Sequence, residues 1–238
     1  DSFREFVKDY VLGHGNADGL CYFLRGSKYT AAWPSQTVNY IESHDDKTFF
    51  DRISNNFDNP TFEDLRRYKL AYCIVLSSVG IPMLAEGFDT VRTKYGANNT
   101  YLDGEKNALD YFRACTNSGA CEFLRRFAKF RCSSEKSEAL RLFNEPNESY
   151  FKFFKDDIRN AVGVLFNADS SRKCPKIFAA FNPSGFNAYL DLNDFALENF
   201  VQIADTDRFD ENGIPQPRLK AAQILKLPAL SFSLWIDC

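Results

Sequence analysis

The sequence predicts a mixed fold in which an α/β unit over residues 1–147 precedes an all-β unit over 148–238. Helical and strand patterns alternate along the first unit, whereas short strand patterns at a spacing of about ten residues fill the second. Hydrophobic residues make up 45% of the 238 positions, and 24 Phe with 11 Tyr exclude a disordered chain.

The first unit begins with a predicted helix, in which apolar residues recur at helical spacing over 3–10 after Ser2 as a cap. A polar loop over 14–19 and a short apolar segment over 20–24 come next. The β-branched and aromatic run over 37–41 predicts a buried strand that opens into a polar loop.

The same order recurs further along the chain. Thr61, which precedes Glu63 and Asp64, predicts the cap of a helix that reaches residue 79. Residues 81–85 predict a second short strand, so that strand, helix and strand form a parallel α/β arrangement. A long polar loop and two more helical patterns complete the unit, over 88–106, 108–115 and 121–143.

The second unit contains short apolar runs that are separated by turn residues such as Asn-Pro-Ser-Gly. This pattern predicts an antiparallel β-sandwich. The predicted strands cover 150–154, 162–166, 177–181, 188–192, 201–203, 221–227 and 231–236.

Charge and composition limit the partners. With 29 basic and 32 acidic residues the net charge is −3, and we expect no nucleic-acid partner. The longest apolar run, 71–80, is too short to cross a bilayer, so we expect no membrane partner. The 7 cysteines include no CxxC pair, which predicts reduced thiols and no metal site. Reduced thiols without a visible secretion signal favour the cytoplasm.

Two segments follow the predicted strands of the first unit, where parallel α/β folds place their functional groups. The segment 42–46 sets His44 beside Asp45 and Asp46, and a polar turn or helix cap is the alternative interpretation. The segment 86–107 is rich in amides and planar donors, which suit sugar hydroxyls but also describe a solvated loop.

These residues resemble a known family. The run Val38-Asn39-Tyr40-Ile41-Glu42-Ser43-His44-Asp45 is similar to the strand-seven motif of the alpha-amylase superfamily of glycoside hydrolases, family 13. The following segment looks like the eighth strand and loop of the pullulanase, isoamylase and glycogen-debranching type, at 80–83, 92–94, 98–101 and 107–111. Residues 163–182 and 227–235 resemble the β-sandwich that follows the barrel in this family.

The resemblance implies that residues 1–147 are the carboxyl-terminal part of a (β/α)8 TIM barrel, around strands six to eight, and that 148–238 are the β-sandwich. A complete barrel takes about 250 residues. No motif matches the nucleophilic Asp or the general-acid Glu of the family. We therefore expect a piece of a longer enzyme, in agreement with a first residue that is not Met, and no turnover by the piece alone.

The resemblance also implies site residues. Asp45 matches the third acid of the family, which stabilises the transition state, and His44 would donate to a sugar hydroxyl. Asp46 stands where the family usually has Asn, which leaves its contact open. The substrate-binding residues of the following loop would be Asn98, Asn99, Tyr101, Glu105 and Asn107.

The implied activity is retaining hydrolysis of α-1,6 branch linkages in glycogen, starch or pullulan, without a cofactor. The partners would be an α-glucan, such as a maltooligosaccharide, and the amino-terminal half of the same enzyme or a self-associated copy, because an open barrel exposes strand edges. A non-catalytic α-glucan-binding module and an interaction protein derived from this family remain the alternatives.

Overall fold

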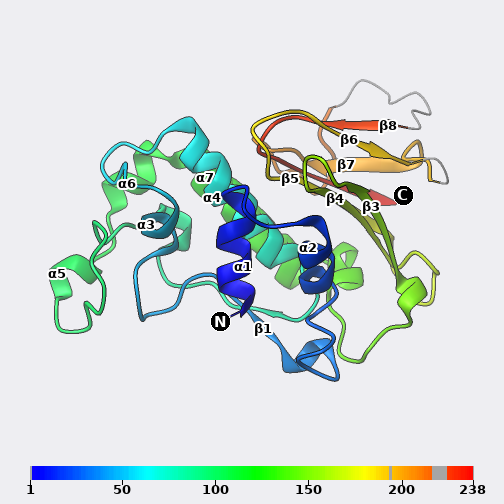
Figure 1. The fold of residues 1–238 in the computed structure, drawn as a ribbon, viewed down its shortest axis with the longest axis horizontal. Helices are drawn as coiled ribbons and strands as arrows, with labels where there is room; N and C mark the ends of the chain where they lie inside the picture. The colour runs from blue at the N-terminus through cyan, green and yellow to red at the C-terminus, as the bar shows by residue number, and fades with distance from the viewer. Residues whose placement is uncertain (1, 193–194, 216–223, 238) are drawn as a thin grey trace.

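The structure, a computed structural model, describes residues 2–192, 195–215 and 224–237. Helices and 3-10 turns occupy most of the chain up to Leu140, and seven of the nine strands follow it in the described residues (Figure 1). The helices are α1 (Ser2–Val11), α2 (Ala17–Leu24), α3 (Phe49–Ile53), α4 (Phe62–Ser77), α5 (Gly104–Asn107), α6 (Tyr111–Thr116) and α7 (Ser118–Ser133). Short 3-10 turns are η1 (Pro34–Gln36), η2 (Phe88–Thr90), η3 (Glu135–Leu140) and η4 (Glu148–Tyr150).

The start of α4 confirms the predicted cap. The Thr61 hydroxyl accepts a hydrogen bond from the Asp64 N–H at 3.1 Å, and the Asp64 carboxylate accepts one from the Thr61 N–H at 2.9 Å. This capping box satisfies two backbone donors that the helix itself cannot. Every residue from Tyr68 to Ser77 is buried, so α4 is the central helix of its layer.

Other predicted elements differ in extent. Residues 17–19, predicted as loop, belong to α2, because Asn16 caps the helix by accepting from the Gly19 N–H at 2.7 Å. The predicted strands 37–41 and 81–85 shrink to β1 (Val38–Asn39) and β2 (Ile81–Pro82), which pair in parallel. The prediction of a buried strand is wrong for Val38, which is 49% exposed.

The larger sheet has 5 strands in the order β3-β4-β5-β9-β7, and its neighbouring strands are antiparallel. A second sheet pairs β6 with β8. The strands are β3 (Phe151–Asp156), β4 (Ala161–Phe166), β5 (Ile177–Asn182), β6 (Ala188–Asp191), β7 (Phe200–Ala204), β8 (Ile224–Leu227) and β9 (Ser231–Asp237). They confirm the predicted antiparallel strands, except that residues 221–223 lie outside the described residues.

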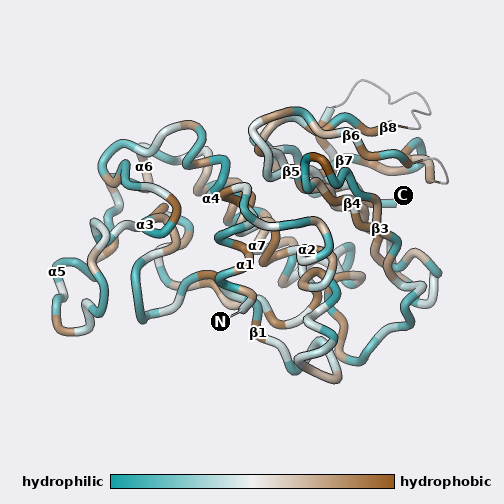
Figure 2. The backbone as a smooth tube through the Cα atoms, viewed as in Figure 1, coloured by the Kyte–Doolittle hydropathy of each residue, from teal (hydrophilic) through white to brown (hydrophobic). Residues whose placement is uncertain are grey.

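The larger sheet lies between the helices and the β6–β8 pair. Residues from α1, α2, α4 and α7 share one buried cluster with the inner face of the sheet, and Trp235 on its outer face packs with β6 and β8. Figure 2 shows hydrophobic residues gathered in the middle of the molecule, within α4 and in the strands of the sheet. The inner cluster crosses residue 147, so the two units predicted from the sequence share one core, and a boundary there stays a prediction.

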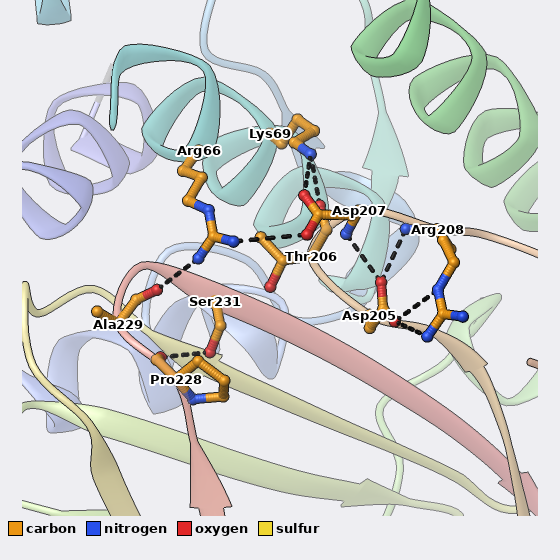
Figure 3. A network of polar contacts seen from close by, with 9 residues as sticks. All are labelled: Arg66, Lys69, Asp205, Thr206, Asp207, Arg208, Pro228, Ala229 and Ser231. Carbon is orange, nitrogen blue, oxygen red and sulfur yellow. Dashed lines mark hydrogen bonds and ion pairs between the residues drawn. The ribbon is translucent and has the colours of Figure 1, made fainter. Parts of the chain in front are cut away.

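A polar contact complements this core where α4 meets the loop after β7. Lys69 donates to the Thr206 carbonyl at 2.5 Å and lies 3.3 Å from the Asp207 carboxylate. Arg66 donates to the Ala229 carbonyl at 3.0 Å and also faces Asp207 (Figure 3). Two side chains of one helix thereby hold two loops at the same end of the larger sheet, the loop after β7 and the loop before β9.

Phe127 packs α7 against the larger sheet. Its ring is fully buried and stacks on Phe232 of β9 and on Phe209, with ring centroids 5.5 and 5.2 Å apart. We expect Phe127→Ala to lower the free energy of unfolding by about 3–5 kcal/mol, because it removes apolar contacts from both layers and leaves a cavity. Urea unfolding followed by circular dichroism measures this loss.

Phe112→Ala is the matched control, because this ring lies on α6 and is 80% exposed. Its unfolding free energy should change by no more than about 0.5 kcal/mol. Equal losses in the two variants would show that Phe127 does not join the layers.

Candidate functional site

The segments that follow β1 and β2 meet through a buried ion pair. Because the two strands are parallel, their carboxyl ends lie at the same edge. Glu42 follows β1, and Arg92 follows β2 after the turn η2. The Arg92 guanidinium donates to Glu42 Oε1 at 3.1 Å, and the two residues are only 8% and 3% exposed. The pair therefore fixes one loop to the other beneath the surface.

Glu42 has a second donor. Its Oε2 accepts a hydrogen bond from the Phe49 N–H at 2.6 Å, at the first residue of α3. Burial raises the pKa of Glu42, while the Phe49 N–H and the Arg92 charge oppose that rise. A buried carboxylate with donors on both oxygens costs less free energy than a bare one, so Glu42 organises three segments rather than presenting itself to a ligand.

Asp51 of α3 extends the network to the second loop. Its carboxylate accepts hydrogen bonds from the Thr93 hydroxyl and, at 2.8 Å, from the Lys94 N–H. Lys94 is itself 2% exposed, and its ammonium donates to the Asp46 main-chain carbonyl at 3.3 Å. Burial, followed by the nearby Arg92 charge, lowers the pKa of Lys94. The loop after β2 thus reaches back to the loop after β1.

His44 and Asp45 stand on this base at the surface. The His44 Nε2 lies 3.4 Å from Asp45 Oδ2, and the two side chains are 89% and 70% exposed. Asp46 has φ +64, a left-handed conformation that is uncommon for a residue with a side chain. Its carboxylate accepts from Arg4 of α1 at 2.9 Å. The two adjacent acids are therefore separated, one directed into an ion pair and one into solvent.

The loop with the other predicted site residues extends to one end of the molecule, around α5 (Figure 1). Asn107 is occupied within it, because its amide accepts from the Thr100 hydroxyl at 2.8 Å and donates to the Thr100 carbonyl at 2.6 Å. Asn98 accepts from the Asn99 N–H at 2.8 Å. Tyr101, 80% exposed, is free of that internal bonding, and Glu105 is exposed as well.

The structure does not join the two groups of predicted residues. Across the described residues, no hydrogen bond or ion pair links His44 or Asp45 to Asn98, Asn99 or Tyr101. The same holds for Glu105 and Asn107, the latter being held by Thr100. The role of Asn107 that the contacts support is to shape its own loop, and its predicted contact with a sugar stays a prediction.

Sequence reasoning missed the residues that hold the site. Glu42, Arg92 and Lys94 lie inside the quoted motifs, and a charged residue directly after a strand could have indicated a buried pair. Arg113 of α6 closes the back of the loop by donating to the Val91 and Phe57 carbonyls, and burial lowers its pKa. Only the folded chain brings Arg4 and Arg113 to these loops.

The arrangement offers one exposed carboxylate and one exposed imidazole on a rigid base. These groups can accept and donate hydrogen bonds to a polar ligand. Within the described ranges, no set of three or more His, Cys, Asp and Glu side chains is placed to hold a metal ion. Nor does any helix of those ranges have the length and apolar character that a bilayer crossing requires.

Comparison with known proteins shows relatives of one kind. No protein-family model matches the chain. A pullulanase of Bacillus subtilis (strain 168) is 34% identical over 151 residues, which are 55% of this chain and 21% of the pullulanase. An isoamylase of Flavobacterium sp is 22% identical over 227 residues, 85% of this chain and 28% of the isoamylase. The chain thus spans about a quarter of the length of these relatives.

Solved structures agree over the whole chain. A Paenibacillus barengoltzii pullulanase complexed with maltohexaose and alpha-cyclodextrin matches with a TM-score of 0.78 at 25% identity, covering 100% of this chain and 38% of that one. The type I pullulanase of Bacillus subtilis, complexed with maltose, matches with a TM-score of 0.79 at 22% identity, covering 99% and 34%. The resemblance to debranching enzymes predicted from the sequence is confirmed.

The buried pair gives a prediction with a pH dependence. We expect Arg92→Met to lower the free energy of unfolding by about 3–5 kcal/mol at neutral pH, because it leaves the Glu42 carboxylate buried without its cation. The loss should shrink as the pH falls. Burial already raises the folded pKa of Glu42 above its ordinary value of 4.5, and removal of Arg92 raises it further.

Proton linkage determines how the stability loss of Arg92→Met depends on pH. Below 4.5, Glu42 is protonated in the folded and unfolded states alike, and the penalty is absent. As the pH rises from there through the folded pKa, only the unfolded state ionises freely, and stability is lost. Urea unfolding at about pH 5 and pH 7 measures the difference. Arg126→Met, which breaks an exposed pair with Glu122, should cost less than about 1 kcal/mol at both pH values. A loss from Arg92→Met that is independent of pH would contradict the charge argument.

Proposed function

We propose that this relative of the pullulanases is the carboxyl-terminal portion of a glycoside hydrolase that cleaves α-1,6 branch linkages of α-glucans with retention. In this proposal residues 1–147 supply the last strands of a (β/α)8 barrel, and 148–238 form its β-sandwich. One observation carries it. His44 and Asp45, which match the family's strand-seven motif, are exposed at the carboxyl end of β1, on a base that Glu42 and Arg92 hold rigid.

In the mechanism, Asp45 accepts hydrogen bonds from ring hydroxyls of the sugar that is cleaved. Such bonds strengthen as the ring flattens toward an oxocarbenium ion, and they supply several kcal/mol. The neighbouring His44 donates to another hydroxyl and orients the ring. Its ring nitrogen faces Asp45 at 3.4 Å, so one ligand can engage both groups. Because the Glu42–Arg92 pair fixes the loop that carries Asp45, the loop needs little reorganisation when positive charge develops on the sugar.

The nucleophile and the acid must come from a preceding part of a longer polypeptide. A retaining pair needs carboxyl groups about 5–5.5 Å apart across the scissile bond. Asp45 and Asp46 do not supply it, because they are neighbours in the chain whose side chains diverge, and the Asp46 carboxylate is paired with Arg4. The isolated chain should therefore bind without turning over.

The comparisons support an α-glucan as the ligand. Related pullulanases have been solved in complex with maltotetraose, maltotriose or maltose, and the same fold extends over 98–100% of this chain. The exposed ring of Tyr101, which is 80% accessible, could stack on a further sugar of the same ligand.

Asp45→Asn in the longer polypeptide tests the function. We expect kcat on pullulan to fall by about 10²–10³, because the amide donates where a charged acceptor is needed as the cation develops. The unfolding midpoint should stay unchanged, since Asp45 is 70% exposed. Steady-state release of reducing sugar measures kcat and KM.

Asp157→Asn, on the exposed turn between β3 and β4, is the control that should leave kcat unaltered. An unchanged rate in Asp45→Asn would reject the role of Asp45. A wild-type polypeptide that binds maltooligosaccharide but releases no sugar from pullulan, glycogen or starch would favour the alternative, a non-catalytic α-glucan-binding protein.

The proposal also makes the β1–β2 pair an interface. Val38 and Ile81 are opposite one another in the register, and each is 49% exposed. A barrel would cover them with the strands of the amino-terminal half. In the isolated chain we expect the same face to drive self-association, visible in sedimentation velocity as a rise in mean mass with concentration.

Ile81→Lys should reduce this association, because a charge on the uncovered strand opposes edge-to-edge pairing. Ile158→Lys is the matched control, because Ile158 is 86% exposed on the turn between β3 and β4. A monodisperse monomer of the wild-type chain at every concentration would contradict the interface.

A further inference from the structure

We propose that Arg4 of α1 is a positioning residue for Asp45, which it orients through Asp46. The inference rests on the function proposed above and adds to it a specific residue from outside the family motifs. The link is short. Arg4 Nη1 donates to Asp46 Oδ2 at 2.9 Å across 42 positions of the chain, and Asp46 is bonded directly to Asp45.

The geometry of Asp46 explains why such a hold is needed. Its φ of +64 places the backbone in the left-handed region, which is less favourable than the right-handed one for a residue with a side chain, although Asp tolerates it better than most, so contacts that hold this conformation stabilise the turn. This bend directs the Asp46 carboxylate toward Arg4, where its side chain is 44% exposed, and leaves the Asp45 side chain 70% exposed. Two cations hold the bend from different elements, Arg4 at the carboxylate and Lys94 at the carbonyl.

Arg4 is itself directed by its neighbours. Its side chain is 14% exposed, and its Nε lies 3.3 Å from Glu5 Oε1. Glu5 is held in turn by Arg52 of α3 at 2.6 Å. The Arg52 hydrogen bond is the largest influence on Glu5 and brings its pKa to about 2, so Glu5 stays charged beside Arg4. The loop of Asp45 is thus tied to α1 and α3 through one chain of alternating charges.

Arg4 is chosen over Lys94 as the specific device because Lys94 also bonds the base of the site through its N–H to Asp51. Replacing Lys94 would disturb that base, whereas Arg4 contacts the loop through the Asp46 carboxylate and, 6.0 Å from the ring centroid, through Tyr40. Among the described residues, Arg4 makes no hydrogen bond to Glu42 or Arg92. A planar guanidinium also defines the direction of a carboxylate better than an ammonium does.

The test compares Arg4→Met and Arg4→Lys with Arg67→Met. Arg67 is the matched control, because its side chain is 17% exposed, pairs with Glu63 at 2.6 Å and donates to the Val11 carbonyl at the end of α1. It therefore also contacts α1 but, among the described residues, makes no hydrogen bond or ion pair with Asp46. On pullulan, the longer polypeptide with Arg4→Met should lose about ten- to a hundredfold in kcat, with KM changed by less than about twofold, since ligand binding stays and alignment is lost. Arg4→Lys should recover part of kcat, and Arg67→Met should retain all of it.

A second readout does not depend on activity. The chain has only 2 histidines, His14 and His44, so the ring resonances of His44 can be followed by NMR in the 238-residue chain. Arg4→Met should shift the His44 resonances and speed cleavage by the protease Lys-C after the exposed Lys47, at an unchanged unfolding midpoint. Arg67→Met should do neither.

The outcomes separate the two proposals. If the wild-type polypeptide is inactive on α-glucans, the proposed function fails and the His44 resonances still decide whether Arg4 holds the turn. If the wild type is active and Arg4→Met retains kcat, the positioning role is overturned and the function stands. Unmoved His44 resonances and unchanged cleavage after Lys47 would also overturn it. If Arg4→Met fails to fold, Asp46→Ala, which removes the carboxylate that Arg4 binds, must reproduce the kcat loss.

Discussion

The buried ion pair between Glu42 and Arg92 is the constraint on which the arrangement of the site depends. β1 and β2 are two residues each and cannot fix the loops that follow them. Once a carboxylate and a guanidinium are removed from water, they need each other, because an unpaired buried charge costs several kcal/mol. The Phe49 N–H completes the set on Glu42. The network therefore selects one conformation of both loops.

The apolar core supports the site by packing the helices against the sheet, and polar contacts fix the position of one layer relative to the other. Phe127 and its aromatic neighbours bury the helices against the sheet, but apolar packing by itself tolerates small shifts between layers. Directed contacts limit those shifts. Lys69 and Arg66 of α4 bind carbonyls in two different loops of the sheet region, and the same helix packs against α1, which carries Arg4. The helix layer is thus held relative to the sheet and to the site.

Local patterns predicted the parts of the fold that local interactions determine. The cap at Thr61 and the strands of the larger sheet follow from residues near one another in sequence. Local patterns did not predict the lengths of β1 and β2. A strand extends only as far as its neighbouring strands pair with it, and here each of the two has only one partner in the described residues. In the site, the motif predicted His44 and Asp45, whereas Arg4 meets Asp46 across 42 positions and left no local pattern. Asn107 shows the reverse limit, since residue type alone did not reveal that Thr100 occupies its amide.

Charge balance explains why the Asp46 carboxylate is ion-paired whereas the Asp45 carboxylate is exposed to solvent. Arg4 and Lys94 converge on Asp46, one at its side chain and one at its carbonyl, so its negative charge is compensated in place. If the Asp45 carboxylate were turned toward the same cations, it would place a second negative charge beside that of Asp46. Turning outward avoids that repulsion and leaves Asp45 hydrated until a ligand replaces the water. The same compensation that stabilises the turn therefore leaves one carboxylate at the surface available to bind.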